Sequence, residues 1–314
     1  MIIKFMTLSG KDVVVTGGAG FIGSWIAEYA SAENRVTIFD DLSTGRQSNI
    51  DGVKKNVRLV KGDVRLAKQV DAAVMDADVV FHQAANVRIP ISIENPALDA
   101  EINIKGTLNV LEACRKHDVG KVVFAASSSI YGHPENFPSK EHDSKMPLSP
   151  YAVSKMTGEA YVNLYAKLHG MRTVSLRYFN VYGPRQRADS PYSGVISIFA
   201  RNIMQGKPLT IYGSGDQTRD FVNVRDVARA NMLAAEHESA SGAINIGTGK
   251  RISINGLAKL MGKISGRKTD MLHKEPRPGD VMHSCADIHL AGKLLGYVPE
   301  ISLEDGLKEL LNKD

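Results

Sequence analysis

The sequence predicts an α/β fold, with a doubly wound parallel sheet and a smaller mixed α/β domain. Two observations predict it. Short, β-branched apolar runs alternate with helix-compatible stretches as far as about residue 177, which is the pattern of parallel strands joined by crossover helices. From about Ser193, short helices, short strands and more Gly and Pro replace that alternation, and this indicates a second domain.

Apolar residues fill consecutive positions in the runs of the first domain, as expected of strands that helices cover on both faces. The expected strands are 12–16, 35–39, 57–60, 79–81, 121–126, 173–177, 209–212 and 243–246. The expected helices are 24–32, 94–117, 151–168, 195–205, 224–237 and 302–311. We therefore divide the chain into a domain at 1–177, onto which 222–248 packs back, and a domain at 178–221 with 249–314.

The composition excludes several classes of protein. The chain has 314 residues, a net charge of +5 and two distant cysteines, Cys114 and Cys285. Its cations are dispersed, so an anionic small ligand is expected and nucleic acid is not. Cysteines without a CxxC or a Cys/His cluster indicate neither a disulfide framework nor a metal site. With no signal-peptide core and no apolar run of about 20 residues, a cytoplasmic protein without a membrane partner is expected.

A glycine-rich turn follows the first expected strand. Gly18-x-Gly20-x-x-Gly23 fits the dinucleotide fingerprint, and Gly17-x-x-Gly20-x-x-Gly23 has a related spacing. Glycine at these positions lets the backbone turn tightly and approach a pyrophosphate at a helix N-terminus. With a strand before it and a helix after it, this turn predicts a Rossmann-type dinucleotide-binding domain.

Asp40 follows the second expected strand and lies 17 residues after Gly23 (40 − 23), near the usual spacing of about 20. A carboxylate there accepts hydrogen bonds from the adenosine ribose and repels a 2′-phosphate, so NAD is expected rather than NADP. The alternative for Asp40 is a helix-cap or turn residue. Asp41 follows it, and Arg46 is close enough to keep NADP open.

Three side chains suggest proton-transfer chemistry. Ser127 follows the apolar run 122–124, at the strand end where α/β sheets place ligands. Tyr151 and Lys155 are four residues apart, so both project from one face of the expected helix. A phenol with a pKa of about 10 is a poor base at neutral pH, and a neighbouring ammonium favours its phenolate. The Ser hydroxyl can hold the substrate oxygen.

The glycine-rich turn, the Ser at a strand end and the Tyr-x-x-x-Lys spacing on a helix together resemble the extended branch of the short-chain dehydrogenase/reductases. The closer resemblance is to UDP-glucose (UDP-galactose) 4-epimerases and their UDP-N-acetylhexosamine relatives, and it runs from about Lys11 to about Leu311. It implies NAD as cofactor, with Asp63 and Val64 beside the adenine and Asn103 near the cofactor, steadying the catalytic strand. For Asn103, a solvent-exposed helix position is the alternative. The implied cofactor-binding set is Gly17, Gly20, Phe21, Ile22, Gly23, Asp40, Asp41, Ser43, Thr44, Gly45, Asp63, Val64, Gln83, Ala84, Ala85, Asn103, Tyr151, Lys155 and Tyr178.

The resemblance also implies a site for a UDP-sugar. Arg219 and Arg277 are expected on the diphosphate, because guanidinium groups bind phosphate oxygens through paired hydrogen bonds. Asp280 is expected on the uridine ribose, and Ser284 beside the sugar C2 substituent. A small residue at 284 leaves space for an N-acetyl group. The implied substrate-binding set is Ser127, Ser128, Ser129, Asn180, Val195, Arg219, Arg277, Asp280 and Ser284.

The reaction expected is inversion at sugar C4, through a 4-keto intermediate and transient reduction of tightly bound NAD. Related 4,6-dehydratases place an Asp-Glu pair, and decarboxylases a Glu, where this chain has Ser128 and Ser129. Elimination therefore lacks its acid and base. A UDP-glucuronate epimerase or decarboxylase stays open, with Arg88 or Arg185 on the carboxylate; Arg88 departs from the family pattern and either contacts a ligand or faces solvent.

A non-catalytic NAD-sensing protein is a further alternative. Such proteins typically lose the Tyr or the Lys, and this chain has both, Tyr151 and Lys155. By analogy with the family, a homodimer is expected through the helices at 94–117 and 151–168.

Overall fold

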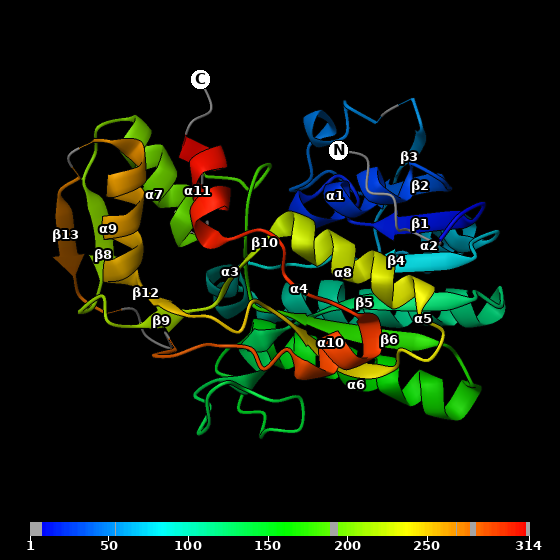
Figure 1. Cartoon of the computed structure of the whole chain (residues 1–314). Helices are drawn as coiled ribbons and strands as arrows, with labels where there is room; N and C mark the ends of the chain where they lie inside the picture. The colour runs from blue at the N-terminus through cyan, green and yellow to red at the C-terminus, as the bar shows by residue number, and fades with distance from the viewer. Residues whose placement is uncertain (1–7, 54, 189–193, 268, 277–280, 312–314) are drawn as a thin grey trace.

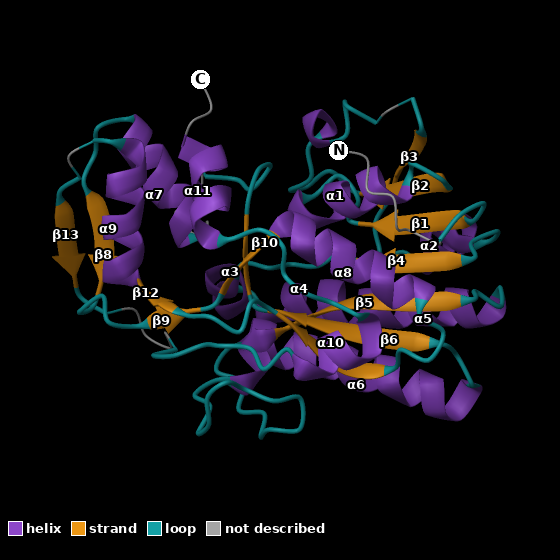
Figure 2. Ribbon diagram, in the orientation of Figure 1, coloured by secondary structure: helices purple, strands orange, loops and turns teal. Residues whose placement is uncertain are grey.

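The computed structural model describes residues 8–311 except 54, 189–193, 268 and 277–280. Seven parallel strands form the main sheet, in the order β11-β6-β5-β4-β1-β2-β3 (Figures 1 and 2). This is the doubly wound order, in which the chain moves outward in both directions from β1. The strands are β1 (Asp12–Thr16), β2 (Arg35–Asp40), β3 (Val57–Lys61), β4 (Val79–His82), β5 (Lys121–Ser127), β6 (Thr173–Tyr178) and β11 (Gly242–Ile246).

Helices cover both faces of this sheet. Val13 and Val15 of β1 enter the core beneath one helical layer, whereas Val14 enters the core beneath the other, because successive strand residues point to opposite faces. The first layer holds α1 (Phe21–Ala30), α8 (Val224–Glu236) and α10 (His289–Leu295). The second holds α2 (Ala67–Val74), α5 (Gly106–Lys116) and α6 (Pro150–His169).

The long helix expected at 94–117 is present as one uninterrupted helical run over 96–116, but it begins at Pro96 rather than at residue 94 and contains a π-helical stretch. The chain forms α3 (Ile89–Glu94), α4 (Pro96–Ala100), a π-helical segment η2 (Glu101–Lys105) and then α5. Asn95 has φ −140° and ψ 75°, outside the helical region, and its side chain accepts a hydrogen bond from the Leu98 amide. The residue before a proline disfavours the α region, so Pro96 starts a new helix.

A second lobe lies beside the carboxyl ends of the strands (Figure 1). Its own apolar core gathers Phe199, Leu257 and Leu307. Its strands are β7 (Asn180–Tyr182), β8 (Leu209–Tyr212), β9 (Thr218–Arg219), β10 (Phe221–Asn223), β12 (Ile252–Ser253) and β13 (Met271–Lys274), which pair as β10-β7, β12-β9 and β13-β8. Its helices are α7 (Val195–Met204), α9 (Ile254–Ser265) and α11 (Leu303–Leu311), and the short turns η1 (Gln47–Asn49) and η3 (Ser128–Tyr131) belong to the first lobe.

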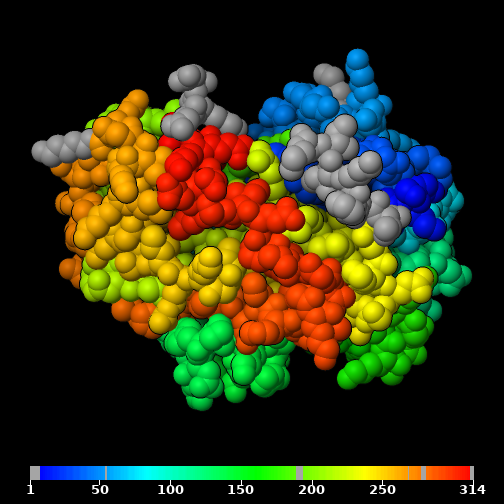
Figure 3. All heavy atoms as spheres, viewed as in Figure 1, coloured from blue at the N-terminus to red at the C-terminus, as the bar shows by residue number. Residues whose placement is uncertain are grey.

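The C-terminal part of the chain joins the two lobes. Figure 3 shows this segment, in orange and red, crossing the face where the lobes meet. Within it, α10 packs on the core of the main sheet and α11 on the core of the second lobe. No described helix is long and apolar enough to span a bilayer.

The predicted fold class is confirmed, and each strand expected for the main sheet is present, with ends that differ by at most one residue. The first helix begins at Phe21 rather than at residue 24, directly after the glycine turn. In the second lobe β8 was predicted with its observed ends, whereas β7, β9, β10, β12 and β13 were not; the helices α2, α3, α9 and α10 were not predicted either. The proposed domain division stays a prediction, and β11 lies in the main sheet as it requires.

Candidate active site

A cleft of about 700 Å³ opens at the carboxyl ends of the strands, within the range typical of ligand pockets. It lies where β1 and β4 adjoin. Strands are added in one direction from β1 to β3 and in the other direction from β4 onward, and α/β sheets bind ligands at such a switch point. Residues from the glycine turn, from the carboxyl ends of β2, β3, β4, β5 and β6, and from α6 line it. Of the predicted residues, those lining it are Gly17, Gly20, Phe21, Ile22, Gly23, Asp40, Asp41, Ser43, Thr44, Asp63, Val64, Gln83, Ala84, Ala85, Ser127, Tyr151, Lys155 and Tyr178.

The glycine turn is packed so closely that side chains are excluded from it. Gly17 has φ +66°, and a Cβ there would lie 2.7 Å from the Ala84 amide nitrogen. A Cβ on Gly23 would lie 2.2 Å from the Gly17 carbonyl oxygen. The turn therefore brings bare backbone and the N-terminus of α1 to the cleft, and amides at a helix N-terminus bind phosphate oxygens. The residues present fit a dinucleotide pyrophosphate.

Asp40 accepts hydrogen bonds from backbone amides of its own turn and also lines the cleft. One carboxylate oxygen accepts the Ala19 amide at 2.9 Å and the other accepts the Leu42 amide at 2.8 Å. Burial raises the pKa of Asp40, and these two hydrogen bonds oppose the shift. Gly45 does not line the cleft; a Cβ there would lie 2.8 Å from Asp40 Oδ1, so this glycine leaves room for the carboxylate. Asp40 is thus both a turn residue and a wall of the cleft.

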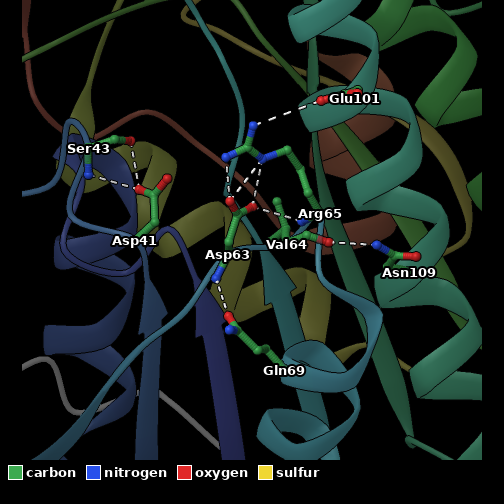
Figure 4. Close-up of polar contacts among 8 residues, drawn as sticks. All are labelled: Asp41, Ser43, Asp63, Val64, Arg65, Gln69, Glu101 and Asn109. Atoms are coloured by element: carbon green, nitrogen blue, oxygen red, sulfur yellow. Dashed lines mark hydrogen bonds and ion pairs between the residues drawn. The ribbon is translucent and has the colours of Figure 1, made fainter.

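Polar groups at the ends of β2 and β3 form the adjoining wall (Figure 4). Asp41 accepts hydrogen bonds from the Ser43 amide at 2.9 Å and hydroxyl at 2.6 Å. Arg65 donates to Asp63 at 2.5 Å and lies 3.9 Å from Glu101. The guanidinium lowers the pKa of Asp63. Arg65 lines the cleft and was not predicted; its only signal was its place two residues after Asp63.

Ser127, Tyr151 and Lys155 meet at the other part of the cleft. Ser127 ends β5, and both other residues lie on α6. The start of α6 is set by Ser149, whose hydroxyl accepts the Ala152 amide at 3.2 Å, with Pro150 at the first helical position. Proline suits that position because its missing N–H would have no partner there.

Burial shifts the pKa values of two of these groups. Tyr151 is partly buried. Burial raises its pKa, hydrogen bonding with Ser127 opposes that rise, and the charge of Asp99 adds to it. Burial lowers the pKa of Lys155 to about 8, and the charge of Asp99 opposes that shift. Desolvation is thus the largest influence on the pKa of Tyr151 in the protein alone, and the expectation that the Lys155 ammonium favours the phenolate stays a prediction.

Asn103 is buried, which excludes the solvent-exposed alternative. It does not line the cleft, and its side-chain hydrogen bonds in the described part of the chain go to Asn86, Asp99 and Ser154 rather than to β5. Its side-chain nitrogen donates to Ser154 Oγ at 3.0 Å and to the Asn86 carbonyl at 3.0 Å, and its oxygen accepts the Asn86 amide at 2.8 Å. Asn103 therefore joins α6 to the loop after β4.

The residues predicted to bind the substrate lie partly beyond the cleft. Ser128 and Ser129 form η3, beside Ser127. Asn180 is in β7 and Val195 starts α7. The Ser284 amide donates to the Thr218 carbonyl at 3.1 Å, so Ser284 and Arg219 lie on adjoining segments. Arg277 and Asp280 lie outside the described residues.

Two buried carboxylates near these segments escaped prediction. Asp99 precedes the π-helical segment and accepts three side-chain hydrogen bonds. Asp220 accepts the amides of Thr248, Gly249 and Ala286, at 2.9–3.1 Å. In the sequence Asp99 stands four residues before Asn103, and Asp220 directly follows Arg219. Neither spacing distinguishes a buried carboxylate from an exposed one.

The fold and the cleft define a Rossmann-type protein in which Ser127, Tyr151 and Lys155 line the same cleft as the glycine turn. Residues 13–247 match the NAD dependent epimerase/dehydratase family. The chain belongs to this family, and NAD is the family's cofactor.

Individual relatives agree with the family assignment. A putative UDP-glucose 4-epimerase of Methanocaldococcus jannaschii is 42% identical over 304 residues, which cover 96% of this chain and 97% of that protein. The solved UDP-N-acetylglucosamine 4-epimerase of Methanobrevibacter ruminantium, in complex with UDP-N-acetylmuramic acid, superposes with a TM-score of 0.93 at 38% identity, covering 97% and 98% of the two chains. A Thermus thermophilus UDP-glucose 4-epimerase in complex with NAD has a TM-score of 0.88 at 38% identity, covering 96% and 98%.

Proposed function

We propose that the protein is a UDP-sugar 4-epimerase that interconverts UDP-glucose with UDP-galactose and UDP-N-acetylglucosamine with UDP-N-acetylgalactosamine, using tightly bound NAD. One observation carries the proposal. The same cleft holds a glycine turn fit for a dinucleotide at one end and Ser127, Tyr151 and Lys155 at the other. Relatives with these activities cover nearly the whole chain.

In the proposed mechanism Tyr151 takes the proton of the sugar C4 hydroxyl, and Ser127 holds the same oxygen. Lys155 stabilises the phenolate by its charge. NAD⁺, when bound, would supply the acceptor for the C4 hydride and the source from which that hydride returns, and its cationic ring would add a charge that favours the phenolate. After the sugar turns over, Tyr151 returns the proton to the C4 oxygen, so the residues end as they began.

The distribution of acidic groups supports inversion rather than elimination. Among the described residues that line the cleft, the carboxylates are Asp40, Asp41 and Asp63. All three lie at the ends of β2 and β3, in the wall drawn in Figure 4 or beside it. The other charged residues in the described lining, Arg65, Arg88 and Lys155, are cations. A dehydration needs a further acid and base next to the sugar.

The substrate residues belong to the same proposal. Arg219 and Arg277 bind the diphosphate, Asp280 the uridine ribose, and Asn180, Val195, Ser128 and Ser129 border the sugar nucleotide. Ser284, on the segment that pairs with Thr218 next to Arg219, leaves space for an N-acetyl group. This small side chain supports the wider of the two substrate ranges.

A UDP-glucuronate-acting enzyme is the second candidate, and Arg88 favours it. Arg88 caps α3 and lines the cleft, where its guanidinium has no carboxylate partner among the described residues. Arg185, the other cation considered, is bound by Glu28 and lies 4.0 Å from the Trp25 ring. It does not line the cleft.

The test is incubation of the purified protein with a panel of UDP-sugars, without added NAD. We expect both hexose pairs to interconvert, with products identified by NMR. Tyr151→Phe should keep bound NAD and lose about 1,000-fold or more in rate, the scale of general-base catalysis. Conversion of UDP-glucuronate alone would replace the first candidate by the second. A fully active Tyr151→Phe variant would remove the proposed mechanism.

We also propose a cytoplasmic homodimer. Val153, Leu164 and Leu168 expose 43%, 43% and 66% of their surface along one side of α6, and apolar strips of this kind mark contact surfaces. The cysteines are free and buried, which suits a reducing compartment. Light scattering should give twice the chain mass, and Leu164→Glu should give the mass of one chain. A monomeric wild type would contradict the proposal.

A further inference from the structure

Asp99 forms a buried junction behind the proposed catalytic groups. It lies on α4 and is 1% exposed. One carboxylate oxygen accepts the Asn86 side-chain amide at 2.7 Å and that of Asn103 at 3.2 Å, and the other accepts the Ser154 hydroxyl at 2.6 Å. Its three donors come from the loop after β4, the π-helical segment and α6. A buried carboxylate is tolerated only when its oxygens are hydrogen-bonded in this way.

The three donors border the reacting groups. Ser154 lies on α6 between Tyr151 and Lys155, and its hydroxyl is also 3.0 Å from the Tyr151 carbonyl. Asn86 lines the cleft. Asn103 is hydrogen-bonded to Asn86 and to Ser154 as well. Asp99 and Asn103 therefore both connect the loop after β4 to α6. A π-helical turn such as the one at Asn103 often occurs at functional sites.

Asp99 is also the carboxylate that acts on Lys155. Lys155 is 4% exposed, and its ammonium lies 4.6 Å from the centre of the Phe124 ring. Burial lowers the pKa of Lys155 and the charge of Asp99 raises it. Glu159, one turn further along α6, is held at 2.7 Å by the buried Arg177. Its charge is thereby compensated.

We propose that Asp99 is a positioning residue of this site: its buried carboxylate fixes α6 against the cleft loop and is the counter-charge of the Lys155 ammonium. The inference rests on the proposed function, in which Lys155 must be charged to stabilise a phenolate. The charge of Asp99 raises the pKa of Tyr151 directly, so it helps the phenolate only by keeping Lys155 charged. Without the carboxylate, burial alone acts on the lysine, and a neutral amine gives the Tyr151 phenolate no support.

The variant Asp99→Asn separates charge from shape. Its amide oxygen can still accept from Asn86 and Asn103, while its nitrogen donates to Ser154 Oγ, which then donates to the Tyr151 carbonyl. The hydrogen-bond pattern can therefore persist while the negative charge is lost. Asp99→Glu restores the charge. Ser154→Ala removes one donor and keeps the charge.

The ionisation of Lys155 is followed by NMR of labelled lysine Cε, without substrate. The other titratable groups facing it are Tyr151 on its own helix and His82 on β4. In Asp99→Asn we expect the Lys155 titration to fall by about one pH unit, the smaller end of the effect of a nearby opposite charge. The alkaline limb of kcat/KM should move with it. Asp99→Glu should move both back toward the wild type.

Asp71→Asn, a change at a surface carboxylate paired with Lys116, is the matched control and should leave the titration of Lys155 in place. An unmoved Lys155 titration in folded Asp99→Asn would overturn the inference. If Asp99→Asn does not fold, Ser154→Ala is the deciding variant. A lower kcat with an unmoved Lys155 titration supports the inference. A lowered Lys155 titration in Ser154→Ala overturns it. A wild type inactive on every UDP-sugar would instead refute the proposed function, since the NMR titration needs no turnover.

Discussion

His82, at the end of β4, should make the folded state sensitive to acid. It is 2% exposed, with Nδ1 2.7 Å from the Thr16 hydroxyl and Nε2 3.0 Å from the Thr107 hydroxyl. Thr107 donates its own proton to the Asn103 carbonyl. The Thr107 hydroxyl oxygen therefore accepts the Nε2–H of His82, and Nδ1 of His82 accepts the hydroxyl proton of Thr16. This arrangement satisfies the neutral ring, and a protonated ring would have a donor facing Thr16 Oγ1.

The size of the effect follows from the two pKa values. Burial, and secondarily the charge of Lys155, lowers the pKa of His82 from 6.5 to about 3. Between these values the unfolded state binds the proton and the folded state does not, so stability is lost as the pH falls below the unfolded pKa. Integrating from about pH 7.5 to about pH 5 gives a loss of about 2 kcal/mol from this residue.

The measurement is the free energy of unfolding in urea at these two pH values. We expect His82→Gln to be less stable than the wild type at the higher pH, because a buried hydrogen bond is lost, and to lose about 2 kcal/mol less on acidification. His133→Gln removes an exposed histidine and should follow the wild type. If His82→Gln lost as much stability as the wild type on acidification, the buried-histidine argument would be refuted.

Three further predictions concern packing and specificity. Glu159→Gln leaves the buried Arg177 without its carboxylate and should cost about 3 kcal/mol in urea unfolding; an unchanged unfolding midpoint would contradict this. Gly23→Ala drives a methyl into the carbonyl of the first glycine of the turn and should weaken NAD binding about tenfold or more by calorimetry, whereas Gly52→Ala, in open space, should not. Ser284→Tyr should lower turnover of the N-acetylated pair about 10- to 100-fold relative to the plain hexoses; equal loss on both would refute the assigned position.

The local pattern was enough to predict the sheet. Strands that helices cover on both faces have continuous apolar runs in the sequence. The strands at 12–16 and 121–126 could therefore be identified without knowing which strands lie beside them. The break at Asn95 was missed, although Asn before Pro96 is a signal of one. The short strands β9 and β12 carry no period that a two-residue segment can show.

For the site, the chain alone pointed to Ser127, Tyr151 and Lys155, because a strand end and a four-residue helical spacing are local properties that place side chains on known sides. The pKa values of these groups depend on the tertiary structure. Which groups are desolvated depends on segments distant in the sequence, and burial decided that the pKa of Tyr151 rises. The same packing brought Asp99 to Ser154 across 55 residues, a contact that no sequence spacing encodes.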